Sequence, residues 1–487
     1  MAKTVHIIGS GFSSLSAASY LAKSGYKVKV FEKNASIGGR ARQFKHEGFT
    51  FDMGPSWYWM PDVFERFFGD FGKKPEDYYK LDKLNPGYKV VFSENNSFEV
   101  SDNLDEIYKA FDEKETDGAK KLKKFMDNAK SNYDIAIKKL VYKPGESPLE
   151  LVTPATVGKV GEFFSNISRD VEKDFENNDL KQILKFPVLF LGARPQDTPS
   201  FYSFMNYADF GLGTWHPKGG FFSVVKAMKE LAESLGVEFQ TNATIEKIDV
   251  NQSGRVKGIQ VNGETLTADY VLSGADYHHT ETLLDEKYRQ YSEQYWDKKV
   301  FAPSSLLFYV GFDKKLKNVN HHNLFFDVDF NQHADDIYKT PKWPKEPLFY
   351  ANFTSLTDPD TAPDGCENGL FLIPLAPDIN DTEELREQYF HKIITRFEKL
   401  TGQSVQKNII FKKSFCAKDF KNDYNSYKGN AYGMANTLLQ TAFLRPRLKS
   451  KKVKNLYFTG QLTVPGPGVP PALISGKLVS ELIKKYD

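Results

Sequence analysis

The sequence is poor in cysteine, in net charge and in long apolar runs, and each scarcity excludes a class of protein. Cys366 and Cys416 are the only two cysteines among 487 residues, too few for a disulfide framework and without metal-ligand spacing. The formal net charge of +2 leaves no dense basic surface for nucleic acid. The longest apolar run, near residues 186–193, is well short of the roughly 20 residues that a membrane span needs. We therefore expect a cytoplasmic protein without a metal, a nucleic-acid partner, a signal peptide or a spanning helix.

Aromatic residues, in contrast, are abundant, with 40 Phe and 25 Tyr. Aromatic side chains line cavities for long apolar ligands, although an aromatic-rich core would give the same composition. A chain of 487 residues is also too long for one simple core, so we expect two or three subdomains.

The N-terminus has the order of elements that binds a dinucleotide. An apolar strand at residues 5–8 runs into a glycine loop, a helix with apolar spacing follows, and a second strand at residues 27–31 ends in Glu32. The loop backbone and the helix N-terminus suit a pyrophosphate, and a carboxylate at Glu32 suits the adenosine ribose. Ser14 stands where the third glycine of the motif is usual, so the helix must pack on its strand with a hydroxymethyl group between them. The candidate residues of this unit are Gly9, Gly11, Phe12, Ser13, Ser14, Glu32 and Lys33.

A second glycine turn, Gly38-Gly39-Arg40, follows within a few residues. It offers another close backbone approach with a cation beside it, and together with the first loop it favours FAD over NAD. The segment Gly54-Pro55-Ser56 comes shortly afterwards and leads into the aromatic residues Trp57, Tyr58 and Trp59.

These motifs, in this order and spacing, resemble the bacterial phytoene-desaturase type of carotenoid desaturase. The resemblance spans nearly the whole chain and includes the C-terminal segments Asn455–Gly460 and Pro465–Pro470, which look like the family's closing flavin motif. It implies a two-domain flavoprotein of the GR2 type that binds FAD. It also implies contacts to the cofactor from Gly54, Pro55, Ser56, Ile245, Gly460, Gln461, Gly468, Val469 and Pro470. The chain departs from the family pattern at Gln461, Leu462, Val464 and Pro467, which puts details of the flavin-edge contacts in doubt.

The positions of the motifs predict an α/β fold with a discontinuous, Rossmann-like FAD-binding domain of residues 1–75, 214–285 and 418–487. Residues 76–213 are predicted to be mostly helical and to face a membrane. Residues 286–417 are predicted to form an inserted substrate-binding domain of sheet and helix above the flavin.

The segment from Lys120 to Val141 is predicted to be a basic amphipathic helix. Such a helix suits an anionic membrane surface, and it also matches an ordinary surface helix packed on a core. Because a carotenoid is apolar and no span is visible, we expect peripheral docking on the inner face of the cell membrane.

The sequence lacks a Ser-His-Asp set, a thiol with a matched base and a metal cluster. The pairs His278-His279 and His321-His322 have neither helical i, i+4 spacing nor cysteine partners, so turn or surface positions are expected for both. The flavin is therefore expected to carry the chemistry as a hydride acceptor, and no catalytic side chain is assigned. Trp57, Tyr58 and Trp59 are candidate substrate contacts that would stabilise a polyene cation, with ordinary packing as the alternative.

Four kinds of function are considered: a carotenoid desaturase, a carotenoid isomerase, an amine or porphyrinogen oxidase, and a prenyl-protein chaperone. The resemblance favours phytoene desaturase, which converts phytoene to lycopene, over the alternative of a 1-hydroxycarotenoid 3,4-desaturase. A carotenoid isomerase and an amine or porphyrinogen oxidase share the fold, and quinone or O2 would reoxidise the flavin. A prenyl-protein chaperone of the Rab dissociation-inhibitor type is opposed by the intact Gly-Gly-Arg turn and C-terminal glycine motif.

Overall fold

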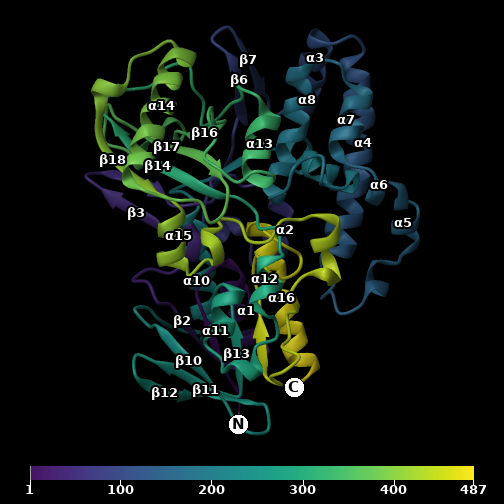
Figure 1. The fold of residues 1–487 in the computed structure, drawn as a ribbon, viewed down its shortest axis with the longest axis vertical. Helices are drawn as coiled ribbons and strands as arrows, with labels where there is room; N and C mark the ends of the chain where they lie inside the picture. The colour runs from purple at the N-terminus through teal and green to yellow at the C-terminus, as the bar shows by residue number, and fades with distance from the viewer. Residues whose placement is uncertain (1) are drawn as a thin grey trace.

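The computed structural model describes residues 2–487, apart from the side chain of Phe190. Figure 1 shows three parts: a nucleotide-binding part that holds both termini, a large sheet covered by α14 (Glu383–Thr401), and a cluster of helices beside that sheet. The fold is mixed α/β, as expected.

A parallel five-stranded sheet forms the core of the nucleotide-binding part, with the strand order β19-β13-β1-β2-β9. Its strands are β1 (Thr4–Ile8), β2 (Lys27–Phe31), β9 (Glu238–Gln240), β13 (Tyr270–Ser273) and β19 (Leu456–Phe458). The five strands come from three separate stretches of the chain, which meet because β1 pairs with both β2 and β13. The residues of β1, β13 and β19 are almost all buried, as in parallel strands covered on both faces, whereas the edge strand β9 has no buried residue.

Helices α1 (Phe12–Lys23) and α16 (Val469–Lys485) pack side by side on this sheet, and α10 (Phe222–Ser234) also packs on α1. Small residues allow the close approach of α1 and α16. A Cβ atom on Gly476 would lie 2.4 Å from the carbonyl oxygen of Ser13, so only glycine fits there. The predicted β-meander is present as β10 (Ile245–Val250), β11 (Val256–Val261) and β12 (Glu264–Thr267), with Asn262 and Gly263 at positive φ in its hairpin turn.

A seven-stranded sheet, which we call the roof sheet, has the order β18-β14-β17-β16-β15-β6-β7. Its strands are β6 (Tyr88–Ser93), β7 (Asn96–Val100), β14 (Ser304–Phe312), β15 (His322–Phe325), β16 (Phe349–Asn352), β17 (Glu367–Leu375) and β18 (Ile409–Phe415). Residues on its outer face form a core with α14, whereas residues on its inner face belong to the cores below it.

Residues 81–100 correct the expectation of a mostly helical region 76–213. They form the hairpin β6–β7, which pairs with β15 through a parallel ladder, and the short strand β5 (Leu81–Lys83), which pairs with β8 (Trp215–Pro217). In β7 buried and more exposed residues alternate, which is the pattern of a half-buried strand. A further hairpin pairs β3 (Gln43–His46) with β4 (Phe49–Asp52).

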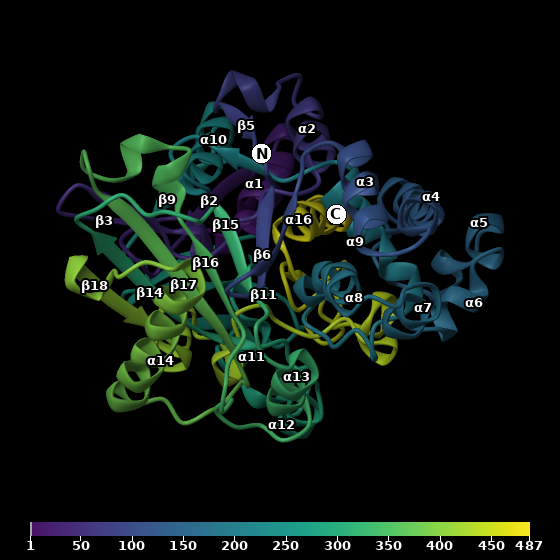
Figure 2. The same ribbon diagram turned by 90° about the horizontal axis from the view of Figure 1, so that it is seen from above.

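The remaining helices lie beside the roof sheet and around the nucleotide-binding part. They are α2 (Pro61–Gly69), α3 (Leu104–Lys114), α4 (Gly118–Ile135), α5 (Pro154–Val157), α6 (Val160–Phe164), α7 (Ile167–Asp174), α8 (Asn178–Lys185), α9 (Phe204–Asn206), α11 (Tyr277–Thr282), α12 (Glu293–Asp297), α13 (Phe330–Tyr338) and α15 (Ala417–Tyr424). Figure 2 shows α5 and α6 at the outer edge of the molecule. Among the described residues, no helix has both the length and the apolar character to cross a bilayer.

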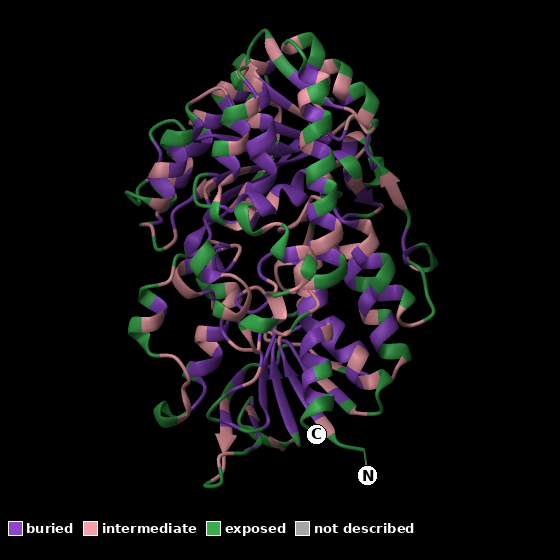
Figure 3. Ribbon diagram, turned by 90° about the vertical axis from the view of Figure 1, so that its right-hand side faces the viewer, coloured by how far each residue is buried: buried purple, intermediate pink, exposed green. Residues whose placement is uncertain are grey.

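The predicted basic helix is α4 with a π-helical turn at Ala136–Leu140. Leu122, Met126 and Tyr133 are buried, so its apolar face packs on the protein core. Figure 3 shows this pattern generally, with buried strands inside and exposed residues on the outer helices. The helix is thus an ordinary surface helix on its apolar side, and only its lysines are available to a membrane.

Candidate active site

One cavity of about 1100 Å³ lies between the nucleotide-binding sheet and the roof sheet. Loops at the ends of β1, β2 and β13 line one end, which we call the nucleotide half. Side chains from the roof sheet and the helical cluster line the other end, which we call the apolar half. The cavity exceeds the roughly 300–1,000 Å³ of most ligand sites, which agrees with room for two ligands.

The glycine loop and the first turn of α1 face the nucleotide half, where Gly9, Gly11, Phe12 and Ser13 line the wall. In the described chain, no side chain caps the N-terminus of α1. A Cβ atom added to Gly11 would meet no heavy atom within 4 Å, so that position opens onto free space. An uncapped helix N-terminus facing a space that a side chain would fill is the arrangement that binds a pyrophosphate.

Ser14 does not line the cavity, although the motif placed it among the cofactor candidates. It is fully buried between α1 and the end of β13. A Cβ atom on Gly274 would lie only 2.0 Å from Ser14 Oγ, so Gly274 supplies the space that the motif's third glycine usually leaves. Gly274, which lies 260 positions later in the chain, therefore compensates for the missing third glycine of the motif. The role of Ser14 is in packing.

Glu32 is buried at the end of β2 and lines the cavity. Its carboxylate accepts hydrogen bonds from the Ser10 amide at 3.1 Å, the Ser10 hydroxyl at 2.7 Å and the Asn34 amide at 2.9 Å. These bonds fix the carboxylate beside the loop, as ribose recognition requires. Lys33 and Ile245 line the wall next to it, as predicted.

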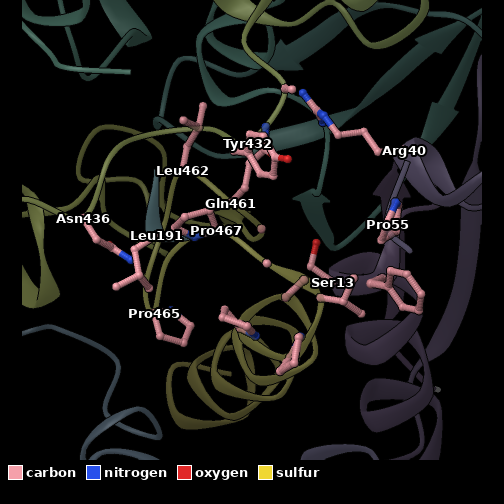
Figure 4. Close-up of a pocket in the computed structure, with 18 of the residues that line it drawn as sticks. Ser13, Arg40, Pro55, Leu191, Tyr432, Asn436, Gln461, Leu462, Pro465 and Pro467 are labelled. Atoms are coloured by element: carbon pink, nitrogen blue, oxygen red, sulfur yellow. The ribbon is translucent and has the colours of Figure 1, made fainter. Parts of the chain in front are cut away.

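Arg40 extends along the cavity wall from the Gly-Gly-Arg turn (Figure 4). Its Nη2 donates to Ser426 Oγ at 3.1 Å, while its buried Nε has no hydrogen-bond partner among the described residues. Burial also lowers the pKa of the Arg40 guanidinium. A buried cation with an unused donor points to an anionic ligand in the cavity. The turn needs its glycines because Gly38 and Gly39 have φ values of 106° and 56°.

The C-terminal motif closes the same end of the cavity. Its lining residues are Gly460, Gln461, Pro465, Pro467, Gly468, Val469 and Pro470. Figure 4 shows Gln461 and Pro467 across the pocket from Ser13 and Pro55. Helix α16 begins at Val469 and directs its positive end toward the cavity, although Pro470 and Pro471 have no N–H to donate. Together with the α1 N-terminus and Arg40, these segments fit an FAD.

The apolar half contains two of the three predicted aromatic contacts. Trp57 and Trp59 line the cavity, whereas Tyr58 does not. Tyr58 is fully buried, stacks on Phe64 with 4.2 Å between ring centroids, and hydrogen-bonds the Tyr79 hydroxyl at 2.8 Å. Consecutive residues of an extended segment point to opposite sides, which is why the middle one turns into the core. The candidate substrate contacts are therefore reduced to Trp57 and Trp59.

Residues of the roof sheet are the part of the site that the sequence did not reveal. Inward-facing side chains of β14, β16 and β17 line the apolar half, among them Ser305, Leu307, Tyr350 and Leu372. No motif marks these positions; only the period-two alternation of a half-buried strand could have pointed to them.

His321 and His322 are also buried beneath this sheet, with 3% and 0% exposure, which corrects the expected surface position. The Nδ1 atom of His321 makes a hydrogen bond to Thr357 and that of His322 to Tyr350, while His322 Nε2 is buried without a partner among the described residues. The pair His278-His279 lies in α11, where His278 contacts Glu293. Among the described residues, no group of three or more His, Cys, Asp or Glu side chains could hold a metal ion.

Two carboxyl groups near the cavity, those of the half-buried Asp52 and the buried Asp209, have raised pKa values. Burial raises the pKa of Asp52 to about 6, although backbone N–H groups of Phe221 and Phe222 and the Gln43 side chain donate to it. Burial also raises the pKa of Asp209 to about 8, and Tyr88 donates to this carboxyl at 2.7 Å. Tyr88 in turn packs edge-on against Trp57.

Comparisons with known proteins agree with this geometry. The family model for flavin-containing amine oxidoreductases matches residues 12–484. A carotenoid 3,4-desaturase from Haloarcula japonica is 40% identical over 485 residues, which cover 98% of this chain and 97% of the relative. A zeta-carotene-forming phytoene desaturase from Myxococcus xanthus is 29% identical over 99% of this chain and 94% of its own length. An oxidoreductase structure from Methanosarcina mazei shares the fold, with a TM-score of 0.65 at 16% identity over 98% of this chain and 100% of that one.

Proposed function

The chain belongs to the flavin-containing amine oxidoreductase family and, within it, to the FAD-dependent carotenoid desaturases, and from this premise we propose that it acts on the 3,4 bond of a hydroxylated carotenoid. The substrate is a long polyene with a hydroxyl group near the bond that is desaturated. Support comes from the 40% identity to a carotenoid 3,4-desaturase, against 29% to a phytoene desaturase.

The structural observation that supports this proposal is an unpaired hydroxyl in the apolar half. Among buried side-chain polar atoms without a hydrogen-bond partner in the described chain, only Arg40 Nε and Ser305 Oγ belong to residues that line the cavity. Arg40 serves the nucleotide half. Ser305 is 1% exposed and lies on the roof sheet among apolar side chains, where an unpaired hydroxyl costs about 1–3 kcal/mol. A substrate hydroxyl would satisfy it.

Phytoene desaturation is the second candidate, and it is the one that the sequence resemblance favoured. The apolar lining suits phytoene equally well, and a 29% identical relative forms zeta-carotene from it. Phytoene has no hydroxyl, however, so it would leave Ser305 Oγ unpaired.

A matched pair of substrates separates the two candidates. The purified, FAD-loaded protein is assayed with a 1-hydroxycarotenoid and with phytoene, and the products are identified by absorption and mass. We expect 3,4-desaturation of the hydroxylated carotenoid and little change in phytoene. Conversion of phytoene to lycopene, with the hydroxylated carotenoid left unchanged, would establish the second candidate instead.

Two serine variants then test the role of Ser305. Ser305→Ala is expected to lower kcat/KM for the hydroxylated carotenoid by about tenfold to hundredfold, since a lost buried hydrogen bond costs about 1–3 kcal/mol. The control is Ser304→Ala, which removes the neighbouring hydroxyl that donates to the Gly429 carbonyl but does not line the cavity. Equal effects of the two variants would refute hydroxyl recognition by Ser305.

When bound, FAD supplies the two-electron oxidation by accepting a hydride from a substrate carbon. The residues of the chain bind, orient and shield. The uncapped start of α1, Arg40 and Glu32 hold the nucleotide, and the start of α16 places positive potential at the opposite wall. Trp57 and Trp59 exclude water from the polyene and present their π-faces to positive charge that develops on it.

Membrane docking is proposed at the rim of the apolar half. The rim segments 149–164 and 438–444 carry exposed apolar side chains, including Phe164 at 78%, Leu149 at 75% and Leu439 at 75% exposure. Phe164 and Leu439 also line the cavity. A contiguous apolar rim at a cavity mouth is typical of a surface that contacts lipid. The exposed Lys139 and Lys143 lie beside it in sequence, which suits the anionic inner face of a cell membrane.

Flotation with anionic vesicles tests this rim. The triple variant Leu149→Glu, Phe164→Glu and Leu439→Glu is expected to stay unbound, whereas Ile410→Glu, which places the same charge on exposed strand β18, should float like the parent. If the triple variant floats and a Lys121→Glu, Lys123→Glu and Lys124→Glu variant does not, the docking surface is α4.

The electron acceptor that reoxidises the flavin is proposed to be a quinone or O2. Anaerobic turnover that resumes only on addition of a quinone would select the first, and turnover with formation of peroxide in air would select the second.

A further inference from the structure

Desaturation removes a proton as well as a hydride, and the cavity contains one chain of polar side chains that reaches from its wall into the roof sheet. Ser56 Oγ lies 2.9 Å from the hydroxyl of Tyr350, and that hydroxyl lies 2.7 Å from Nδ1 of His322. Ser56 and Tyr350 line the cavity. His322 is fully buried behind Trp57, on which its ring stacks at 4.2 Å between centroids and 11° between planes.

The directions of these hydrogen bonds follow from the neighbours of His322. Asn352 Nδ2 donates to the His321 carbonyl at 3.2 Å, and Asn352 Oδ1 accepts from Thr354 at 2.7 Å, so the amide orientation is fixed. Nδ2 also lies 3.2 Å from His322 Nδ1, and an amide nitrogen can only donate. His322 Nδ1 is therefore unprotonated and accepts. The Tyr350 hydroxyl must donate to it, and the oxygen of Tyr350 then accepts from Ser56.

The position of this chain matches the place where a proton must leave. Ser56 follows Gly54 and Pro55, which line the nucleotide half, so the Tyr350 hydroxyl stands where the two halves meet. On the inner face of the roof sheet, Leu324 and Leu372 flank Tyr350 in the same row. Among these three cross-strand neighbours, Tyr350 alone offers an oxygen to a substrate.

We propose that Tyr350 is the catalytic residue that takes the substrate proton and that His322 is the positioning residue that receives the proton of Tyr350. The C–H bond next to the oxidised carbon breaks, its electron pair forms the new C=C bond, and the proton goes to the Tyr350 oxygen. The Tyr350 O–H proton passes at the same time to His322 Nδ1. The reverse transfer restores both groups when the proton leaves to water. Bound FAD would supply the two-electron oxidant by accepting the hydride, so atoms and electrons balance.

The weakness of the base is no obstacle. A C–H bond adjacent to a carbocation is a very strong acid, so a neutral imidazole suffices to accept its proton. Burial, with His216 nearby, lowers the pKa of His322 well below its usual value, which keeps Nδ1 free of a proton at neutral pH. Burial also raises the pKa of Tyr350, which keeps the phenol neutral and ready to donate. The inference rests on desaturation itself and holds for either candidate bond.

Tyr350→Phe tests the proposal because it removes one oxygen and keeps the ring. We expect desaturation to fall by about a hundredfold, within the range of roughly 10²- to 10⁴-fold for a general base. Binding of the carotenoid, measured by the shift of its absorption, should stay within about twofold of the parent, as expected when only an oxygen used in the reaction is removed. The substrate that is recovered should be enriched in E/Z isomers, because a cation that keeps its proton can rotate about its weakened double bonds and take the hydride back.

A second variant and a control keep the result interpretable. His322→Gln keeps an acceptor for Tyr350 but a poorer base, so we expect an intermediate loss of desaturation with the same isomer enrichment. Tyr389→Phe removes a buried hydroxyl that donates to the Pro344 carbonyl on the far side of the roof sheet and should change neither readout. The proposal would be overturned if Tyr350→Phe desaturated the substrate at nearly the parental rate. It would also be overturned if this variant lost carotenoid binding to the same extent as desaturation and gave no isomer enrichment.

Discussion

The two halves of the cavity are built from different parts of the chain in different ways. The nucleotide half consists of backbone and a few side chains at the ends of parallel strands, and its segments are short, glycine-rich and continuous in sequence. The apolar half consists of side chains from β14, β16, β17, α13 and the 430s and 440s, which are far apart in sequence.

This difference has a physical reason. A phosphate is bound by backbone N–H groups at a helix N-terminus, which requires glycines at fixed spacing and leaves a signature in the sequence. A long polyene offers little to hydrogen-bond, so many combinations of apolar side chains can bind it, and polar atoms such as Ser305 Oγ and the Tyr350 hydroxyl are few in this half. Substitutions at Gly11 and Arg40 affect the nucleotide half, a substitution at Trp57 affects the apolar half, and one at Asp209 affects neither.

Gly11→Val is expected to abolish FAD binding. Its Cβ would project into the open space beside the α1 N-terminus, where the pyrophosphate needs the closest backbone approach. The flavin-to-protein absorbance ratio of the purified variant measures the loss. Gly69→Val is the control, because its Cβ also meets no atom within 4 Å, but Gly69 is exposed at the end of α2 and does not line the cavity. Full flavin occupancy of Gly11→Val would show that the nucleotide lies elsewhere.

Arg40→Met should weaken FAD binding by about tenfold to hundredfold, since a hydrogen bond to a charged group contributes roughly 1.5–3 kcal/mol. Fluorescence titration of the apoprotein with FAD gives the two dissociation constants. Arg42→Met is the matched change on a neighbouring arginine that pairs with Asp423 and does not line the cavity. If Arg42→Met weakens FAD as much as Arg40→Met does, the unpaired Nε is not the group that meets the cofactor.

Trp57→Leu acts on the apolar half alone. Loss of its π-face should lower kcat by about tenfold, because a cation–π contact in a dry site contributes roughly 1–2 kcal/mol. FAD content should remain at the parental level. Trp57→Phe keeps an aromatic face and should recover most of the rate. A leucine variant as active as the phenylalanine variant would assign Trp57 to packing only.

Asp209→Asn is expected to have the smallest effect of these substitutions, and the effect is on the stability of the folded protein. The folded-state pKa of Asp209 is raised to about 8, so its contribution is fully present below its unfolded pKa of about 4 and is lost as pH rises through about 8. Asparagine keeps an oxygen for Tyr88 and does not ionise. We expect the melting temperature of the variant relative to the parent to increase from pH 5 to pH 8 by about 2 °C per pH unit. A constant difference across this range would mean that Asp209 titrates normally.

The same contrast explains how much of the molecule the sequence could predict. The glycine loop, Glu32, the Gly-Gly-Arg turn and the C-terminal motif all line one cavity end, the first three as expected from spacing and the last as expected from the family resemblance. Ser14 and Tyr58 do not line the cavity. The direction of each side chain is set by packing, of Ser14 against Gly274 and of Tyr58 against Phe64, and neither partner is adjacent in sequence.

Tertiary pairing decided the rest. The hairpin β6–β7 joins the roof sheet because β15 provides a partner for β6, and Nδ1 of the buried His322 is hydrogen-bonded by Tyr350 and Asn352. Neither partner is visible in the local sequence, so the site residues of the roof sheet could be found only from the structure.

The central claim is that FAD in the nucleotide half oxidises a carotenoid in the apolar half of the same cavity. An anaerobic single-turnover experiment tests it most directly, with FAD-loaded protein, one equivalent of hydroxylated carotenoid and no acceptor, followed by absorption. We predict that the oxidised flavin bands disappear at the same rate as a polyene spectrum shifted to longer wavelength appears, with one double bond formed per flavin. Product formation without loss of the flavin bands, or flavin bleaching without a longer polyene, would contradict the account.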